Sequence, residues 1–165
     1  MTDVGDDGLS LTTVVDCLLL SLSDRQLRLL VPLTAVAEVL DELPELASTV
    51  TGHPWLYGWL PWRQHEVPLL AYEGVAGGSI APLWGDTRVV IFNAIGAAAA
   101  HHFYGIAIRS LSRPLRLGRE SDLQARDVTP PQGAALLVDM GAESAAIPDF
   151  ELLERLVVDA QARRP

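Results

Sequence analysis

The sequence predicts a mainly β fold made of small antiparallel barrels. About eight or nine short apolar segments, bounded by turn-forming residues, are typical of strands. Only two short segments show helical periodicity, and they do not alternate with the strands as they would in a βαβ fold. A small barrel has to be filled with side chains, and 49% of the 165 residues are hydrophobic. The chain can therefore form a substantial core.

The N-terminal part of the chain is expected to contain a leader, a hairpin and a short helix. Residues 1–13 are acidic with little to bury, so we expect a disordered leader before a single domain at 14–162. Apolar residues alternate in 15–22 and 27–31, which predicts two strands joined by a polar turn. They then recur at i, i+3, i+4 and i+7 within 34–43, which predicts a short helix after the second strand.

A tryptophan-rich hairpin is the most distinctive stretch. Residues 55–72 hold three of the four tryptophans, in two apolar segments around a polar tip at 63–66. Gly58 permits close approach of another backbone and Pro61 removes a ladder donor, so we expect a bulge or an edge there. Alternation predicts two faces, one with Trp55, Tyr57 and Trp59 and the other with Leu56, Leu60 and Trp62.

The rest of the chain continues the strand pattern and ends in a helix. A loop rich in glycine spans 73–85 and can include a helical turn at 80–84. The terminal helix is expected from Pro148 or Asp149 to about Ala162. Its apolar stripe is Phe150, Leu153 and Val157. Further strands are predicted at 88–95, 103–111, 115–117, 135–140 and 146–147.

Charge and composition argue against several classes of partner. The net charge is −9, from 21 acidic and 12 basic residues, and binding to nucleic-acid phosphates needs clustered cations. No apolar run approaches about 18 residues, and residues 1–11 lack the pattern of a signal peptide, so we expect a cytoplasmic chain without direct membrane insertion. The single cysteine, Cys17, is expected to be an inert thiol in the core.

No motif of a catalytic or metal site is found, so neither an enzyme activity nor a cofactor is expected. The loop at 73–85 lacks the Gly-Lys-Ser/Thr ending of a phosphate-binding loop. His101 and His102 are adjacent, so on a strand they would point to opposite faces and would not share a metal. His53 and His65 are expected to be solvated polar residues.

The aromatic hairpin resembles a segment of bacterial CheW-like domains. That segment contains a Pro, a Gly, an Asn-Leu-Arg-Gly run and a second Pro before an apolar strand. Here the corresponding places hold Pro54, Gly58, Arg63 and Pro68. The order of the other elements strengthens the resemblance, which covers about residues 15–156. The sequence departs from the pattern at Pro61-Trp62, Gln64, Ala71 and Arg109, which replace Asn-Leu, Gly, Asp and Asp.

The resemblance implies both a fold and a function. CheW-like domains are two antiparallel barrels of about five strands each on a shared core, with a short helix after the second strand and a C-terminal helix. They are non-catalytic adaptors that couple the cytoplasmic tip of a chemoreceptor to the regulatory domain of a chemosensory histidine kinase. The segment at 146–154 is most similar to the CheW-like proteins of type IV pilus twitching-motility clusters.

The candidate partner-binding residues are Arg63, Gln64, Trp59 and Trp62. By resemblance, Arg63 lies on the surface used for receptor and kinase contacts, and its planar guanidinium suits carboxylates. The simpler interpretation of Arg63 is a solvated turn charge or a local ion pair with Glu66. For the tryptophans, core packing and a partly exposed anchor both stay open.

Three alternative functions also stay open. One is a small-ligand binding module that uses the tryptophan-lined region. A second is an enzyme of unfamiliar type, which a concave pocket with convergent titratable groups would support. The third is a CheW-like protein that binds the kinase but not receptors, which the departures from the motif would suit.

Overall fold

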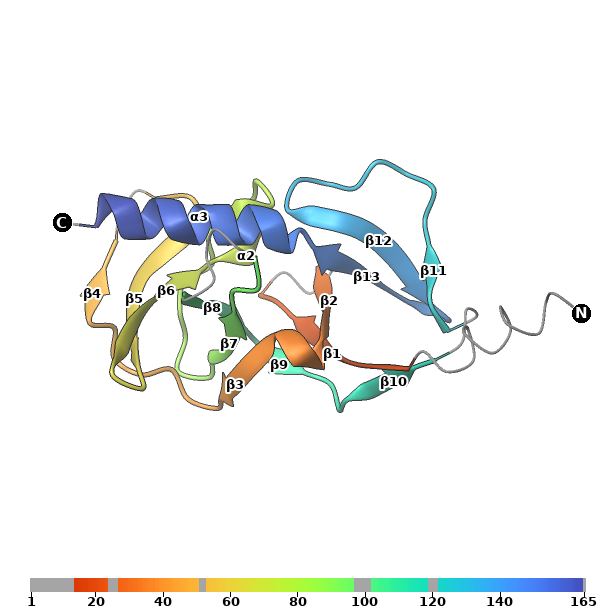
Figure 1. Cartoon of the computed structure of the whole chain (residues 1–165), viewed down its shortest axis with the longest axis horizontal. Helices are drawn as coiled ribbons and strands as arrows, with labels where there is room; N and C mark the ends of the chain where they lie inside the picture. The colour runs from red at the N-terminus through yellow and green to blue at the C-terminus, as the bar shows by residue number, and fades with distance from the viewer. Residues whose placement is uncertain (1–13, 24–26, 51–52, 97–101, 119–121, 165) are drawn as a thin grey trace, which may run out of the picture.

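The computed structural model describes residues 14–23, 27–50, 53–96, 102–118 and 122–164, and its strands form two sheets (Figure 1). The predicted leader, and His101, lie outside the described residues. The mainly β fold with few helices and a C-terminal helix is confirmed.

The first sheet gathers strands from both ends of the chain. Its order is β10-β1-β2-β13-β12-β11, and β9 also pairs with β1. The pairings are antiparallel except the one between β13 and β2, which is parallel. Its strands are β1 (Val15–Ser21), β2 (Arg28–Pro32), β9 (Ser110–Leu111), β10 (Leu115–Leu117), β11 (Gln124–Ala125), β12 (Ala134–Met140) and β13 (Glu143–Pro148).

The second sheet is built from the middle of the chain. Its order is β3-β7-β8-β6-β5-β4, again with one parallel pairing, between β6 and β8. The two sheets thus have seven and six strands rather than about five each, because short edge strands add to them. The strands are β3 (Val36–Leu40), β4 (Ser48–Thr49), β5 (Leu56–Trp62), β6 (His65–Leu70), β7 (Arg88–Asn93) and β8 (Phe103–Ile108).

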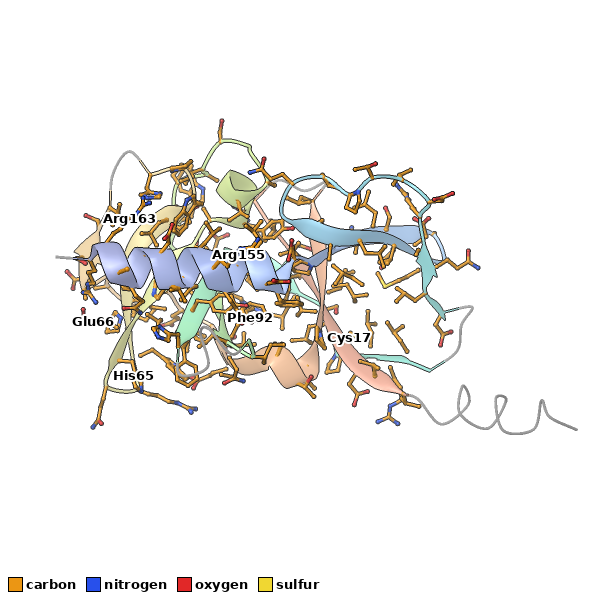
Figure 2. All side chains as sticks on the ribbon, turned by 45° about the horizontal axis from the view of Figure 1, so that its top comes forward. Cys17, His65, Glu66, Phe92, Arg155 and Arg163 are labelled. Atoms are coloured by element: carbon orange, nitrogen blue, oxygen red, sulfur yellow. The ribbon has the colours of Figure 1, made fainter. Side chains whose placement is uncertain are left out.

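One large core joins the two sheets, as the resemblance implies. It includes Leu20 and Leu29 of the first sheet and Phe92 and Ile106 of the second, all fully buried. The terminal helix α3 (Phe150–Arg163) covers this core, and Figure 2 shows Phe92 below it. Two smaller clusters fill the other faces of the sheets. One surrounds Cys17, which is buried as expected, and the other lies beside the second sheet.

The terminal helix begins where the sequence indicated. The Asp149 carboxylate accepts a hydrogen bond from the backbone N–H of Leu152 at 3.1 Å, which caps the first turn. Leu153 and Val157 of the predicted stripe are fully buried, and Phe150 packs at the edge of the core. Glu154 on the same helix accepts hydrogen bonds from the backbone N–H groups of 95–96.

The prediction of a helix over 34–43 was wrong in its extent. A short 3-10 helix does follow β2, but η1 (Leu33–Ala35) ends at once and the chain continues as the strand β3. This segment pairs antiparallel with β7, from Val36 opposite Phe92 to Leu40 opposite Val89. Valine is restricted in helices and favoured in strands, and the hydrogen bonds offered by β7 decide between two patterns that the local sequence permits.

Three smaller predictions also need correction. The helical turn lies at α2 (Tyr72–Val75) rather than at 80–84. The strand predicted at 103–111 is interrupted at Arg109, where the backbone N–H bonds to Ser21 and the chain passes from β8 of the second sheet to β9 of the first. The loop predicted to reach Pro131 contains the short strand β11.

Candidate partner-binding surface

The hairpin of β5 and β6 is present and ends in a two-residue turn. Arg63 and Gln64 form this turn with φ angles of 44° and 65°, a left-handed conformation that non-glycine residues adopt rarely. Trp62 lies opposite His65 in the ladder, so His65 and Glu66 belong to the return strand rather than to the tip. Figure 2 shows His65 near the far end of this hairpin. The turn therefore projects Arg63 and Gln64 into solvent.

Arg63 is held by a glutamate from a distant strand. Its Nη2 lies 2.6 Å from Oε1 of Glu38 on β3, while 64% of the side chain stays exposed. The guanidinium also lies 4.9 Å from the ring centroid of Trp62, in a cation–π contact. Trp62 in turn directs its indole N–H toward the same Glu38 oxygen, at 3.4 Å. Three side chains thus orient one another at the tip.

Arg63 does not form the local ion pair with Glu66 that the sequence permits. Glu66 faces the C-terminal end of α3 and pairs with Arg164, whereas Arg63 faces β3. Glu38 was missed because its segment was assigned to a helix. A strand assignment, together with the acidic residue among apolar ones, would have drawn attention to it.

The two tryptophans proposed as contacts lie on opposite faces of β5 and are both buried. Trp62 is 7% exposed and packs against Phe103, with a centroid distance of 4.8 Å. Trp59 is 4% exposed in the core shared by the sheets, and the Arg164 guanidinium lies 4.2 Å from its ring centroid. The structure therefore brings Arg63, Gln64 and Trp62 together at the tip and separates Trp59 from them.

The predicted faces of this hairpin were wrong because of a bulge at the place where one was expected. The register shifts between Leu56 and Gly58, so Leu56 and Trp59 enter the shared core while Tyr57 joins Leu60 and Trp62 on the other face. An extra residue in one strand reverses the alternation beyond it. Gly58 permits the bulge, since a Cβ there would lie 2.2 Å from the carbonyl oxygen of Ser48 on β4.

The exposed tryptophan of this protein is one that the sequence analysis did not single out. Trp84 is 55% exposed in the loop before β7, whereas Trp55 is half-buried. Trp84 is held by a reciprocal pair of hydrogen bonds with Thr87, which donates its backbone N–H and accepts through Oγ1. Its position in a loop rich in glycine was the feature that could have indicated exposure.

The structure shows what surrounds Ala71 and Arg109, two residues that depart from the CheW-like motif. Ala71 is fully buried at the start of α2, a place where a carboxylate would lose its hydration. Arg109 lies 3.7 Å from Asp86 and lines a cleft of about 410 Å³, together with Arg28 and Ser110. Arg109 thus makes a charge contact of its own where the family commonly has an Asp.

The titratable groups of the described residues do not form a metal-binding cluster. No three side chains of His, Cys, Asp or Glu within this part of the chain are placed to hold a metal ion. Burial, and then the charge of Asp16, raise the pKa of the Cys17 thiol. Burial, and then the charge of Glu73, raise the pKa of Tyr57 to about 12, and its hydroxyl donates to the Ala81 carbonyl at 2.5 Å. Both side chains are therefore neutral at pH 7.

None of the helices within the described residues has the length and apolar character needed to cross a bilayer.

Comparison with solved structures shows that this chain is similar to the scaffolding protein TtCheW from Thermoanaerobacter tengcongensis, whose crystal structure is known. The two share 14% sequence identity with a TM-score of 0.64, over 83% of this chain and 90% of that chain. At this identity the likeness establishes the fold, which is that of a CheW protein. No family model matches the chain, and no curated protein matches it.

Proposed function

We propose that this chain is a non-catalytic chemosensory adaptor that couples a chemoreceptor to a sensor histidine kinase. The observation that supports it most is the exposed guanidinium of Arg63, fixed by Glu38 and Trp62 at a hairpin tip of a CheW fold. The solved neighbour is itself described as a scaffolding protein. The function would need no reacting group, only surfaces that hold two partners in a fixed relation.

The tip is suited to recognise a carboxylate on a partner. A guanidinium has five N–H donors in a planar fork, and Glu38 is bonded to one nitrogen of Arg63. The ion pair and the Trp62 ring restrict the side chain before binding, so less conformational entropy is lost when a partner docks. Gln64 beside it adds an exposed amide with both donor and acceptor atoms.

The partners in this proposal are the regulatory domain of a chemosensory histidine kinase and the cytoplasmic tip of a chemoreceptor. The system would be one that controls type IV pilus twitching motility, which the similarity of residues 146–154 to that group supports. A small shift of the receptor would change how the adaptor holds the kinase, and so bias its activity.

The test is a binding assay with both partners from the same genome. Arg63→Glu should weaken binding about tenfold or more, because it places a second negative charge beside Glu38 and reverses the charge offered to the partner. The matched control is Arg116→Glu, which reverses another exposed arginine in an ion pair, with Asp16 on the first sheet. We expect the control to change affinity less than about twofold.

Each outcome of this assay decides between functions. Binding to both partners, lost in Arg63→Glu alone, supports the coupling role. Binding to the kinase domain but not to the receptor favours the narrower adaptor, for which the Arg109–Asp86 contact at the cleft is the motivating observation. Equal effects of the two charge reversals would remove Arg63 from the site, and binding to neither partner would contradict the proposal.

A further inference from the structure

A groove separates the C-terminal end of α3 from the hairpin, on the face away from Trp62. It encloses about 380 Å³, within the range typical of small-molecule sites. Its walls come from segments about a hundred residues apart in the chain. One side holds Val50, His53, Trp55, Leu56 and Trp59, and the other holds Asp159, Ala160, Arg163 and Arg164.

The walls combine aromatic surface with charged side chains of both signs. Trp55 is half-buried and meets the His53 ring edge-on, with centroids 4.6 Å apart. The Arg164 guanidinium covers the Trp59 ring and is paired with Glu66. The Arg163 side chain is 74% exposed and lies 3.6 Å from Asp159, a distance at which no hydrogen bond joins them. Asp159 also lines the groove and engages one terminal nitrogen of Arg163 in this ion pair, so the donors on the other guanidinium nitrogens are the ones available at the rim.

One polar atom of the groove residues is unsatisfied. Nδ1 of His53 is buried and makes no hydrogen bond to any described residue. Most buried polar atoms in proteins have a partner, so an exception of this kind indicates that something is needed to complete the site.

We propose that this groove binds a small aromatic carboxylate. The flat apolar body would lie along Trp55 and Leu56, and the carboxylate would be held at the rim by the Arg163 guanidinium, whose planar fork matches two oxygens. Charge selects the acid over its neutral analogues, while the volume restricts the ligand to one or two rings. This site is separate from the Arg63 tip, so its failure would leave the adaptor proposal untouched.

The experiment measures binding of benzoate, 3-phenylpropionate and 1-naphthoate to the full chain by calorimetry, each beside its neutral amide. At least one acid should bind with a dissociation constant below about 1 mM, and its amide should bind about tenfold more weakly because it cannot form the charge-assisted contact. Quenching of tryptophan fluorescence by the same acid provides a second readout, since Trp55 and Trp59 line the groove.

Arg163→Gln should weaken binding of that acid about tenfold and leave binding of its amide unchanged. Arg155→Gln is the matched control, because Arg155 makes the same i, i+4 pair on the same helix, 3.5 Å from Glu151. Figure 2 places Arg155 and Arg163 apart along α3. No binding of any acid at about 10 mM, equal affinities for acid and amide, or equal effects of the two substitutions would overturn the proposal.

Discussion

At the scale of single residues, the tryptophans divide between core and surface in a way that composition alone did not reveal. Trp59 and Trp62 anchor two different hydrophobic clusters on the two faces of one strand. Trp84, in a loop, exposes 55% of its surface. The large apolar area of an indole therefore stabilises the fold at two positions and stays in water at the third.

Truncation of these side chains should separate the two roles. Trp59→Ala should lower the free energy of unfolding by about 3–5 kcal/mol, because it leaves a cavity in the shared core and removes the ring under Arg164. Trp84→Ala should change it by less than about 1 kcal/mol. Urea denaturation of both variants beside the wild type measures the difference. A small effect of Trp59→Ala would contradict its place in the core.

At the scale of elements, the bulge in β5 decides which side chains the hairpin presents to each face. The hairpin was predicted from two apolar segments around a polar tip, and it is present, with its turn confined to residues 63–64. The alternation changes phase at Gly58, where β4 approaches from the side. The hairpin was thus predictable from the sequence, whereas the side chains that lie on each of its faces depended on the neighbouring strand β4.

Gly58→Ala tests the bulge. The φ of 153° and the Ser48 carbonyl oxygen, 2.2 Å from the position of a Cβ, should make this substitution cost at least about 2 kcal/mol of unfolding free energy. Gly85→Ala is the control, because nothing lies within 4 Å of a Cβ there, and it should cost less than about 1 kcal/mol. Thermal or urea melts compare the two, and equal costs would show that β4 does not press on Gly58.

At the scale of the whole molecule, buried phenols link its stability to alkaline pH. Burial raises the pKa of Tyr57 to about 12, and it also raises the pKa values of Tyr72 and Tyr104. An unfolded chain would lose these protons near pH 10, so between about pH 10 and 12 the folded state binds more protons than the unfolded one. These phenols therefore contribute no pH dependence below this range, and the free energy of unfolding should fall as the pH rises through it.

Tyr57→Phe should make this fall shallower, because one of the three phenols no longer contributes. At pH 8 the variant should lose only about 1 kcal/mol, the value typical of one hydrogen bond, here to Ala81. Urea melts of both proteins at pH 8 and pH 11 give the two slopes. Parallel slopes would exclude Tyr57 as a contributor to the alkaline transition.

The sequence by itself determined the fold class, most strands, the capped terminal helix and the position of the bulge, because these depend on alternation, a capping Asp149 and a glycine. Only the tertiary structure decided that 36–40 is a strand, since β7 supplies its hydrogen bonds. It also decided that Arg63 pairs with Glu38, 25 residues away, and that Arg164 covers Trp59. Contacts between distant segments leave no mark on local periodicity, and these contacts shape both proposed sites.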